Sequence, residues 1–261
     1  MPPISSPRID LSLFPPAHCL GNVPADTQSA GWWTTQFSRV GGRHRQHSQS
    51  RIKCAPMEKR RMGIPGIEKA GWGEHICVFF DTKDELLNLT VPYIKAGLED
   101  NEFCMWITGD PITENDAFHA LEQVLPDAHQ YLVKKQLEIL PHSQWYLSSG
   151  SFDPVLVLHN WLSKAKDAQA KGFAGVRITG NPFWLGSEQD WEQFGAYEQA
   201  VTQSINNQRV LALCTYPRKI CKIDNVMQVL SSHQSALIAH NEYWQRHVIP
   251  QSCLREYREF T

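Results

Sequence analysis

Residues 173–184 read Phe-Ala-Gly-Val-Arg-Ile-Thr-Gly-Asn-Pro-Phe-Trp, and this stretch decides the predicted fold. Its first seven residues have the apolar and β-branched character of a strand, and the Gly-Asn-Pro turn at 180–182 ends that strand. Ligands of open α/β sheets bind outside the carboxyl ends of the strands, where this stretch places Phe183 and Trp184. The central charge, Arg177, needs a partner because a strand covered on both faces buries it.

Strand-like and helix-like segments alternate along the rest of the chain, which predicts a parallel sheet. The strands are apolar on both faces, as expected when helices cover both sides of the sheet. The predicted fold is therefore α/β, a three-layer and mostly parallel sheet with helices on both faces. We predict strands at 75–80, 102–108, 137–140, 173–179 and 209–216, and helices at 83–99, 113–125, 128–134, 154–171, 187–206 and 224–231.

The two ends of the chain differ from this regular part. Residues 1–56 hold seven of the sixteen prolines and six Lys/Arg against two Asp/Glu, without a helical or strand period. We predict that residues 1–62 are a disordered extension, or that the start codon lies too far upstream and Met57 or Met62 is the first residue. An organelle transit peptide is a third and less favoured interpretation. Residues 63–240 form the predicted domain, and 241–261 a short tail.

Composition places the protein among ordinary soluble globular chains. Of its 261 residues, 42% are hydrophobic and 20% charged, and the net charge of −2 gives no reason to expect direct binding of nucleic acid or of an acidic membrane. No apolar run is long enough to cross a membrane. Seven cysteines without a CxxC pair indicate a reducing, cytoplasmic compartment and no disulfide framework.

The common catalytic motifs are missing from the sequence. The turn after the first long strand reads Asp-Thr-Lys-Asp at 81–84, so the glycine-rich phosphate loop of nucleotide hydrolases is absent. GxGxxG, HExxH and GxSxG are absent as well. We therefore predict a binding protein and not an enzyme, since no nucleophile–base pair emerges from the sequence.

Several strands carry residues that bind metals elsewhere. His75 and Cys77 alternate onto one face of their strand, and with Cys104 and Cys214 they offer imidazole and thiolate ligands. No pair has the close spacing of a typical zinc site. We therefore favour the interpretation that the strand cysteines pack in the core, and predict no metal.

Arg177 has a candidate partner on the next helix. Glu198 follows Phe194 by four residues and precedes Val201 by three, so it shares the apolar stripe of that helix. We predict an ion pair between Arg177 and Glu198. The pair either orders the strand–helix unit or also offers guanidinium donors to a small anionic or carbonyl ligand.

Aromatic side chains gather at strand ends and in loops, where a pocket is expected. Exposed aromatic loops are unfavourable unless they cover something. They either line a ligand site or seal the open end of the core. These residues are Trp145, Tyr146, Phe183, Trp184 and Tyr216.

Six segments, taken in order, resemble the MEDS domain, the methanogen/methylotroph sensory domain named from a dichloromethane-responsive regulator. The resemblance extends over about residues 63–240. The segments are His-Ile-Cys-x-Phe at 75–79, Trp-Ile-Thr-Gly at 106–109, Trp-Tyr-Leu…Gly-x-Phe-Asp-Pro at 145–154, Gly-x-Arg-Ile-Thr-Gly at 175–180, Trp184, and Leu-Cys-x-Tyr at 213–216.

The resemblance implies a RecA/KaiC-like sheet that has lost its phosphate loop and senses simple carbon compounds or hydrocarbon derivatives. Members are often fused to a histidine kinase or a DNA-binding output. Only about 21 residues follow His240, so a separate histidine kinase or transcriptional regulator is the expected partner. The matching positions are His75, Cys77, Arg177, Trp184, Cys214 and Tyr216, with Glu198 in the place of an acidic residue on the following helix.

The sequence thus predicts a stand-alone small-molecule sensory protein whose signal is read by another protein. One alternative is a degenerate RecA-like nucleotide-binding protein or ATPase, in which Lys83 would act. Another is a structural adaptor whose cleft is filled by its own aromatic side chains. No cofactor is identified. The predicted ligand-binding residues are His75, Cys77, Trp145, Tyr146, Arg177, Trp184, Glu198 and Tyr216.

Overall fold

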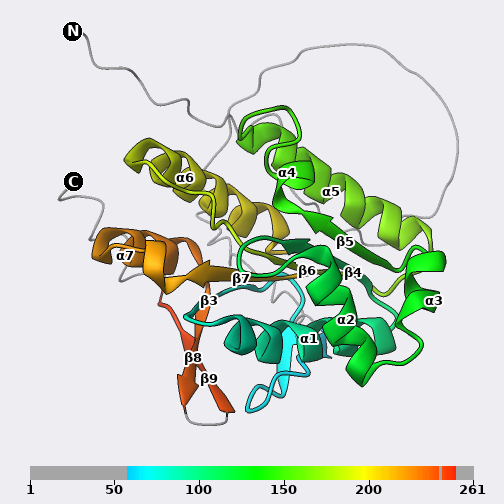
Figure 1. The fold of residues 1–261 in the computed structure, drawn as a ribbon. Helices are drawn as coiled ribbons and strands as arrows, with labels where there is room; N and C mark the ends of the chain where they lie inside the picture. Colours follow the sequence, from blue (N-terminus) through cyan, green and yellow to red (C-terminus); the bar gives the residue numbers. More distant parts are fainter. Residues whose placement is uncertain (1–57, 241–242, 251–261) are drawn as a thin grey trace, which may run out of the picture. The chain divides into compact units, whose positions relative to one another are not determined.

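The structure, a computed structural model, describes residues 58–240 and 243–250. These residues belong to one compact unit, in which strands and helices alternate (Figure 1). The elements are β1 (Lys59–Arg61), β2 (Lys69–Gly71), β3 (His75–Phe80), α1 (Lys83–Glu99), β4 (Phe103–Thr108), α2 (Glu114–Val124), α3 (Ala128–Val133), β5 (Leu137–Pro141), α4 (His142–Trp145), α5 (Pro154–Ala170), β6 (Val176–Gly180), α6 (Glu188–Ile205), β7 (Val210–Pro217), the 3-10 turn η2 (Arg218–Ile220), α7 (Ile223–Ser232), β8 (Ser235–His240) and β9 (Tyr243–Val248).

Seven strands form the main sheet in the order β5-β4-β6-β7-β3-β8-β9. All neighbouring strands are parallel except β8 and β9, which pair antiparallel as a hairpin. β1 and β2 make a separate antiparallel pair. The predicted fold class, a mostly parallel α/β sheet, is confirmed by this topology.

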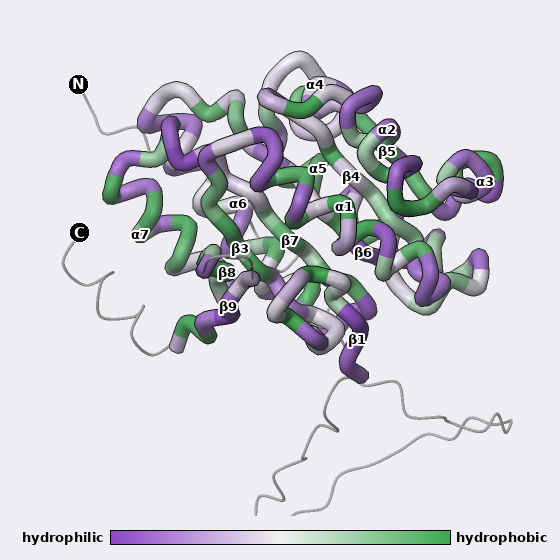
Figure 2. The backbone as a smooth tube through the Cα atoms, turned by 60° about the horizontal axis from the view of Figure 1, so that its bottom comes forward, coloured by the Kyte–Doolittle hydropathy of each residue, from purple (hydrophilic) through white to green (hydrophobic). Residues whose placement is uncertain are grey.

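The central strands are buried along almost their whole length. All residues of β4 and β6 are buried, and β3 and β7 each have one residue that is only partly buried. Apolar residues therefore colour the centre of the backbone tube in Figure 2, whereas β1 at its margin is hydrophilic. A sheet buried on both faces needs helices above and below it, and the chain supplies them after nearly every strand.

Side-chain caps start three of the helices that pack on the sheet. Thr113 with Asp116, and Ser187 with Asp190, form the two predicted capping boxes at α2 and α6. Asp153 accepts two backbone N–H groups at the start of α5, directly before a proline in the first turn. These three predicted helix starts are confirmed.

Alternation along β6 sends neighbouring side chains to opposite faces of the sheet. Arg177 lies opposite Cys104 and Leu211 of the adjacent strands, and its side chain packs against Gly97 of α1. Ile178 points to the other face, opposite Ala212 of β7. The sheet therefore has an α1 face, which also carries α2, and an α6 face, which also carries α5 (Figure 1).

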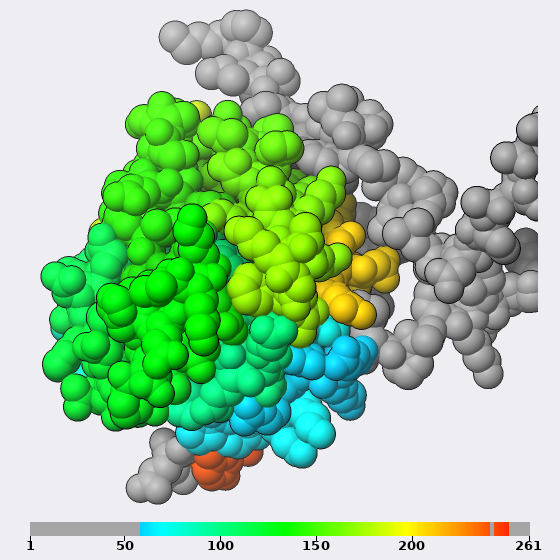
Figure 3. Space-filling view, turned by 90° about the vertical axis from the view of Figure 1, so that its right-hand side faces the viewer, coloured from blue at the N-terminus to red at the C-terminus, as the bar shows by residue number. Residues whose placement is uncertain are grey.

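The fold extends beyond both predicted domain boundaries. Residues 59–61, within the predicted extension, form β1, and the next residue, Met62, is fully buried. Residues 243–248, within the predicted tail, form β9, and its Trp244 is buried. In Figure 3 the blue-to-cyan segment that contains β1 and β2 packs beside the teal segment at the end of α1, where Arg61 pairs with Asp100. The predictions for residues 1–57, 241–242 and 251–261 lie outside the described residues.

The region that the structure describes contains no helix that is both long and apolar enough to cross a membrane.

Candidate functional site

Four side chains with titratable or metal-ligating groups meet on the α6 face of the sheet. His75 begins β3, and Cys214 lies on the neighbouring β7, directly opposite Cys77. Glu198 lies on the buried side of α6, and His233 lies between α7 and β8. We call His75, Glu198, Cys214 and His233 the buried polar cluster; their ligating atoms all lie within 4.8 Å of one another.

The contacts inside the buried polar cluster are short. His75 Nε2 lies 3.1 Å from Cys214 Sγ and 3.1 Å from Glu198 Oε2. His233 Nε2 lies 3.3 Å from the same carboxylate oxygen, and the Cys214 thiol is 3.7 Å from it. The two imidazole rings also stack, with 3.9 Å between their centroids. Glu198 Oε2 is therefore the common centre of the cluster.

The second nitrogen of each imidazole fixes its tautomer. The Thr202 hydroxyl donates to the Ser232 carbonyl oxygen, so it accepts at its lone pair from His75 Nδ1–H at 2.7 Å. His233 Nδ1–H donates to the Val229 carbonyl oxygen at 2.8 Å. Both rings therefore turn the lone pair of Nε2 towards Glu198 and Cys214.

Burial keeps the cluster close to uncharged in the absence of an ion. It lowers the pKa of both His75 and His233 to about 3, so their contacts with Glu198 at pH 7 are not ion pairs of an imidazolium. Burial also raises the pKa of Glu198 to about 7 and that of Cys214 well above its ordinary value. The thiol and both imidazoles are thus neutral at pH 7, whereas Glu198 gains or loses its proton close to that pH.

A small enclosed space adjoins the cluster. The cavity has a volume of about 20 Å³, which is enough for about one water molecule or ion. Its wall is largely apolar, with His75, Glu198 and Cys214 as the polar exceptions at one side. It is lined by His75, Tyr146, Trp161, Leu162, Ile178, Gly180, Tyr197, Glu198, Val201, Ile205, Val210, Ala212 and Cys214.

Aromatic rings close the other side of this space. Tyr146 packs against Phe152, Trp184, Phe194 and Tyr197, with ring centroids 6.0–6.5 Å apart. The hydroxyl of Tyr146 reaches so close to β6 that a Cβ at Gly180 would lie 2.5 Å from it.

A second aromatic layer supports this wall. The Trp145 and Trp161 rings pack at a tilt of 59° with their centroids 4.6 Å apart, and the Trp161 indole N–H donates to the Tyr197 hydroxyl at 2.6 Å. The predicted aromatic gathering exists, but most of its rings pack on one another.

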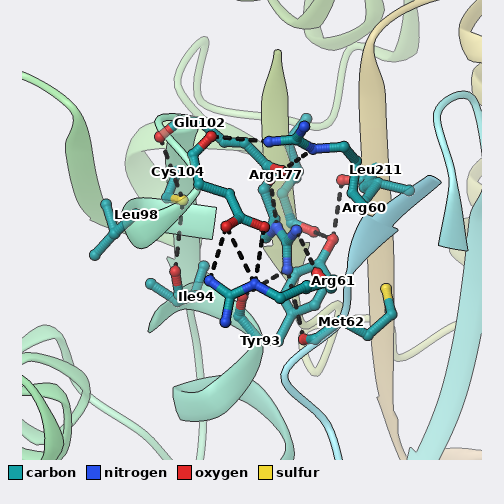
Figure 4. A network of polar contacts seen from close by, with 12 residues as sticks. Arg60, Arg61, Met62, Tyr93, Ile94, Leu98, Glu102, Cys104, Arg177 and Leu211 are labelled. Atoms are coloured by element: carbon teal, nitrogen blue, oxygen red, sulfur yellow. Dashed lines mark hydrogen bonds and ion pairs between the residues drawn. The ribbon is translucent and has the colours of Figure 1, made fainter. Parts of the chain in front are cut away.

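Arg177 lies on the opposite, α1 face, as Figure 4 shows. Its Nε donates to Glu102 Oε2 at 2.6 Å, and its terminal nitrogens donate to the backbone oxygens of Tyr93 at 2.9 Å and Arg61 at 2.7 Å. The predicted pair of Arg177 with Glu198 is therefore wrong. Glu198 belongs to a helix on the other face of the sheet, and Glu102, next to the start of β4, takes its place.

The loop that would hold a nucleotide has a different role. Thr82 caps α1 by accepting the backbone N–H of Glu85, and Lys83 Nζ lies 2.7 Å from Asp116 Oδ1 of α2. The lysine that the nucleotide alternative requires is thus engaged in an ion pair between two helices.

The predicted ligand-binding residues divide into four groups. His75, Tyr146 and Glu198 line the cavity. Cys77 and Tyr216 lie close by, since Cys77 pairs with Cys214 across the strands and the Tyr216 ring packs 5.9 Å from that of His233. Trp145 and Trp184 belong to the surrounding aromatic layer, and Arg177 is on the other face.

The sequence did not indicate His233, and it grouped Cys104 wrongly with the thiols near His75. Cys104 lies on the α1 face, where its Sγ contacts the backbone oxygen of Ile94, so it cannot join His75. Cys214 does join His75, as the metal-binding alternative supposed. Thr202 follows Glu198 by four residues, and this helical spacing was the available signal for a polar face. His233 gave none, because it lies at a junction between elements.

The family model described as MEDS, "MEthanogen/methylotroph, DcmR Sensory domain", matches residues 74–234. The transcriptional repressor DcmR of Methylorubrum extorquens is 25% identical over 176 residues, which are 66% of this chain and 62% of that protein. This chain therefore spans less than two thirds of that relative's length.

Two solved structures are also similar. A KaiC-like protein from Pyrococcus horikoshii has a TM-score of 0.48 at 14% identity, covering 74% of this chain and 87% of that one. The flagellar accessory protein FlaH from Methanocaldococcus jannaschii has a TM-score of 0.41 at 13% identity, covering 71% and 79%. Both TM-scores lie below 0.5, so the fold assignment rests on the sheet topology described above.

Proposed function

Because this chain belongs to the MEDS family of sensory domains, we propose that it binds a small molecule at the buried polar cluster and signals through a separate protein. The observation that carries the proposal is the cavity itself. A few convergent polar groups, His75, Glu198 and Cys214, stand at one side of an otherwise apolar and aromatic enclosure. A mostly apolar wall with a few polar groups is the lining that small-molecule sites typically have.

The chemistry of the wall favours a short, weakly polar compound. Apolar side chains exclude a charged or extended ligand, while the neutral cluster offers hydrogen-bonding groups to one polar atom.

The same groups argue for binding in preference to catalysis. Cys214 and His75 are adjacent, as in enzymes with a cysteine nucleophile. Such enzymes need a low thiol pKa and a basic imidazole. Burial acts in the opposite direction on both, raising the pKa of Cys214 and lowering that of His75.

A route from the cavity to the surface exists through α7. Its last residue, Ser232, accepts the Thr202 hydroxyl through its carbonyl oxygen and immediately precedes His233. Its first turn exposes Ile223 to 74%. A ligand that moves the side chains of the buried polar cluster would therefore shift the population of α7 positions. A regulatory partner that binds the exposed face of α7 could then distinguish the two states. The relative DcmR is a transcriptional repressor, and this supports a partner in transcriptional regulation.

A thermal-shift screen of short alcohols, aldehydes and halogenated alkanes tests the proposal. A ligand at 100 times its dissociation constant adds about 2.7 kcal/mol to the free energy of unfolding. Ala212→Val fills the cavity and should abolish that stabilisation. Ala117→Val adds the same two methyl groups to the core under α2 and should retain it. Stabilisation by no compound, or equal stabilisation of both variants, would count against binding at this cavity.

A further inference from the structure

The buried polar cluster brings two imidazoles, a thiol and a carboxylate to one point from four different segments. We propose that His75, Glu198, Cys214 and His233 bind one divalent transition-metal ion, with Zn²⁺ the best match to the donor set. Nitrogen, sulfur and carboxylate oxygen are the ligands that zinc takes in proteins, usually four of them. The inference goes beyond the sensory role and does not depend on it.

The spacing of the donor atoms fits a tetrahedral ion. Metal–ligand distances of about 2.0–2.3 Å place the donors of a tetrahedral zinc site about 3.3–3.8 Å apart. The His75–Cys214, His75–Glu198, His233–Glu198 and Cys214–Glu198 separations are 3.1, 3.1, 3.3 and 3.7 Å. The remaining pairs lie within 4.8 Å, so an ion would draw them together by about 1 Å.

The orientation of both imidazoles is that of metal ligands. Histidines that bind metal through one nitrogen almost always donate the other N–H to an oxygen atom, which fixes the ring. His75 donates Nδ1–H to the Thr202 hydroxyl, which is itself held by the Ser232 carbonyl, and His233 donates Nδ1–H to the Val229 carbonyl. Both Nε2 lone pairs are left to face the centre of the cluster.

The charges also balance. A thiolate from Cys214 and a carboxylate from Glu198 together neutralise a divalent ion, whereas the two imidazoles are neutral ligands. A neutral centre avoids the large penalty for an uncompensated charge at a site where His75, Glu198 and His233 are buried. Because thiol and carboxylic acid each lose a proton to the solvent when the ion binds, two protons should leave for each ion bound at a pH below both pKa values.

A hydrogen-bonded cluster without metal is the competing explanation. The Cys214 thiol would then donate to His75 Nε2, and a protonated Glu198 to His233 Nε2. This arrangement uses the same contacts, so only metal-binding measurements separate the two.

The experiment uses the full-length chain without an affinity tag, stripped with a chelator and titrated with Co²⁺ and Zn²⁺ at neutral pH. We expect one ion per chain at the cluster, with the thiolate-to-cobalt charge-transfer band and intense d–d bands of a tetrahedral site. Cys214→Ser should remove the charge-transfer band. Cys104→Ser, a buried thiol on the other face, should leave it unchanged.

Thr202→Val tests the geometry without touching a ligand. Loss of the oxygen that holds His75 should weaken metal binding by about 10–100-fold. Thr90→Val is the control, since Thr90 is a helical threonine whose hydroxyl donates to the Leu86 carbonyl of its own helix, away from the cluster. Calorimetry in two buffers of different ionisation enthalpy should report proton release on metal binding, because the Cys214 thiol must lose its proton to bind as a thiolate.

Three results would overturn the proposal. One is binding that Cys214→Ser leaves unchanged, because the bound ions would then sit elsewhere, for example at histidines and cysteines within residues 1–57. Another is a cobalt spectrum without a thiolate band. The third is equal metal affinity of the Thr202→Val and Thr90→Val variants. Circular dichroism of each variant confirms that a loss of binding is not a loss of folding.

Discussion

Arg177 is the largest fully buried side chain among the described residues, and its guanidinium contacts other groups of the protein. Its guanidinium stacks on the Tyr93 ring at 4.8 Å and shares Glu102 with Arg60. Space for it is made on α1 by Gly97, where a Cβ would lie 2.7 Å from Arg177 Cδ, Arg177 Nε and Cys104 Sγ. A glycine in a helix is normally unfavourable, so this one is explained by close approach.

Gly97→Ala should therefore destabilise the protein, by about 1–3 kcal/mol for overpacking around a locked side chain. Gly195→Ala on α6 is the matched control. There the three atoms nearest to the new methyl group all belong to the flexible Gln228 side chain, which can move aside, so helix propensity should make the change neutral or stabilising by up to about 1 kcal/mol. Urea unfolding measures both. Equal effects of the two substitutions would show that Arg177 can move, contrary to its contacts.

At the level of elements, an ion pair connects the first turns of α1 and α2. Asp116 completes the capping box of α2 and also pairs with Lys83 in the first turn of α1. The Lys83 ammonium, followed by the hydrogen bonds from Thr113, lowers the pKa of Asp116 to about 2. Ionised Asp116 is thus favoured by the folded state.

This shift sets the sign of a pH dependence. A carboxyl group whose pKa is lowered on folding stabilises the protein above its unfolded pKa of about 4, and this contribution disappears as pH falls towards 2. Asp116→Asn should therefore be less stable than the natural protein at pH 6, and the gap should shrink at pH 2.5. Thermal unfolding at both pH values measures the gap. A gap that is the same at both would show that the Asp116 charge contributes nothing.

The elements themselves were largely predictable from the sequence. β3 was predicted with its observed bounds, because its apolar run is bounded by polar residues on both sides. β9 was missed because it is an edge strand whose only buried residue is Trp244, and such a strand lacks both an apolar run and strict alternation. β1 was missed because its residues, Lys-Arg-Arg, have no apolar character at all.

The candidate site was predictable only in part, and the limit is physical. That Glu198 would be buried followed from its place in the stripe of α6, whereas its partner depended on which face α6 covers. Periodicity describes one element at a time and does not assign helices to faces of a sheet. His75 and Cys214 could be placed near each other only once the β3–β7 pairing was known.

For the whole molecule, the sheet separates two buried polar groups of different character. The α1 face holds the ion-pair network of Arg177, and the α6 face holds the buried polar cluster. β1 contributes directly to the first, since Arg60 binds Glu102 and the Arg61 carbonyl accepts from Arg177.

The contribution of β1 to stability can be tested with two shortened chains. A chain that begins at Met57 keeps β1, whereas one that begins at Met62 loses Arg60 and the Arg61 carbonyl and leaves Arg177 and Glu102 less satisfied. We expect the chain from Met62 to be less stable by at least about 2 kcal/mol. Urea unfolding of the two chains measures the difference. Equal stability would mean that β1 adds nothing to the fold.

The size of the enclosed space has a mechanical consequence. A cavity of about 20 Å³ is smaller than any organic molecule, so such a ligand cannot enter without pushing its walls apart. Part of its binding free energy would be offset by the free energy needed to move α5 and α6 away from the sheet. Under this geometry the response scales with the bulk of the ligand: a guest too small leaves the helices in place, and one too large fails to enter. The protein would then respond to the volume of its ligand, and the closed packing would be the state without a response.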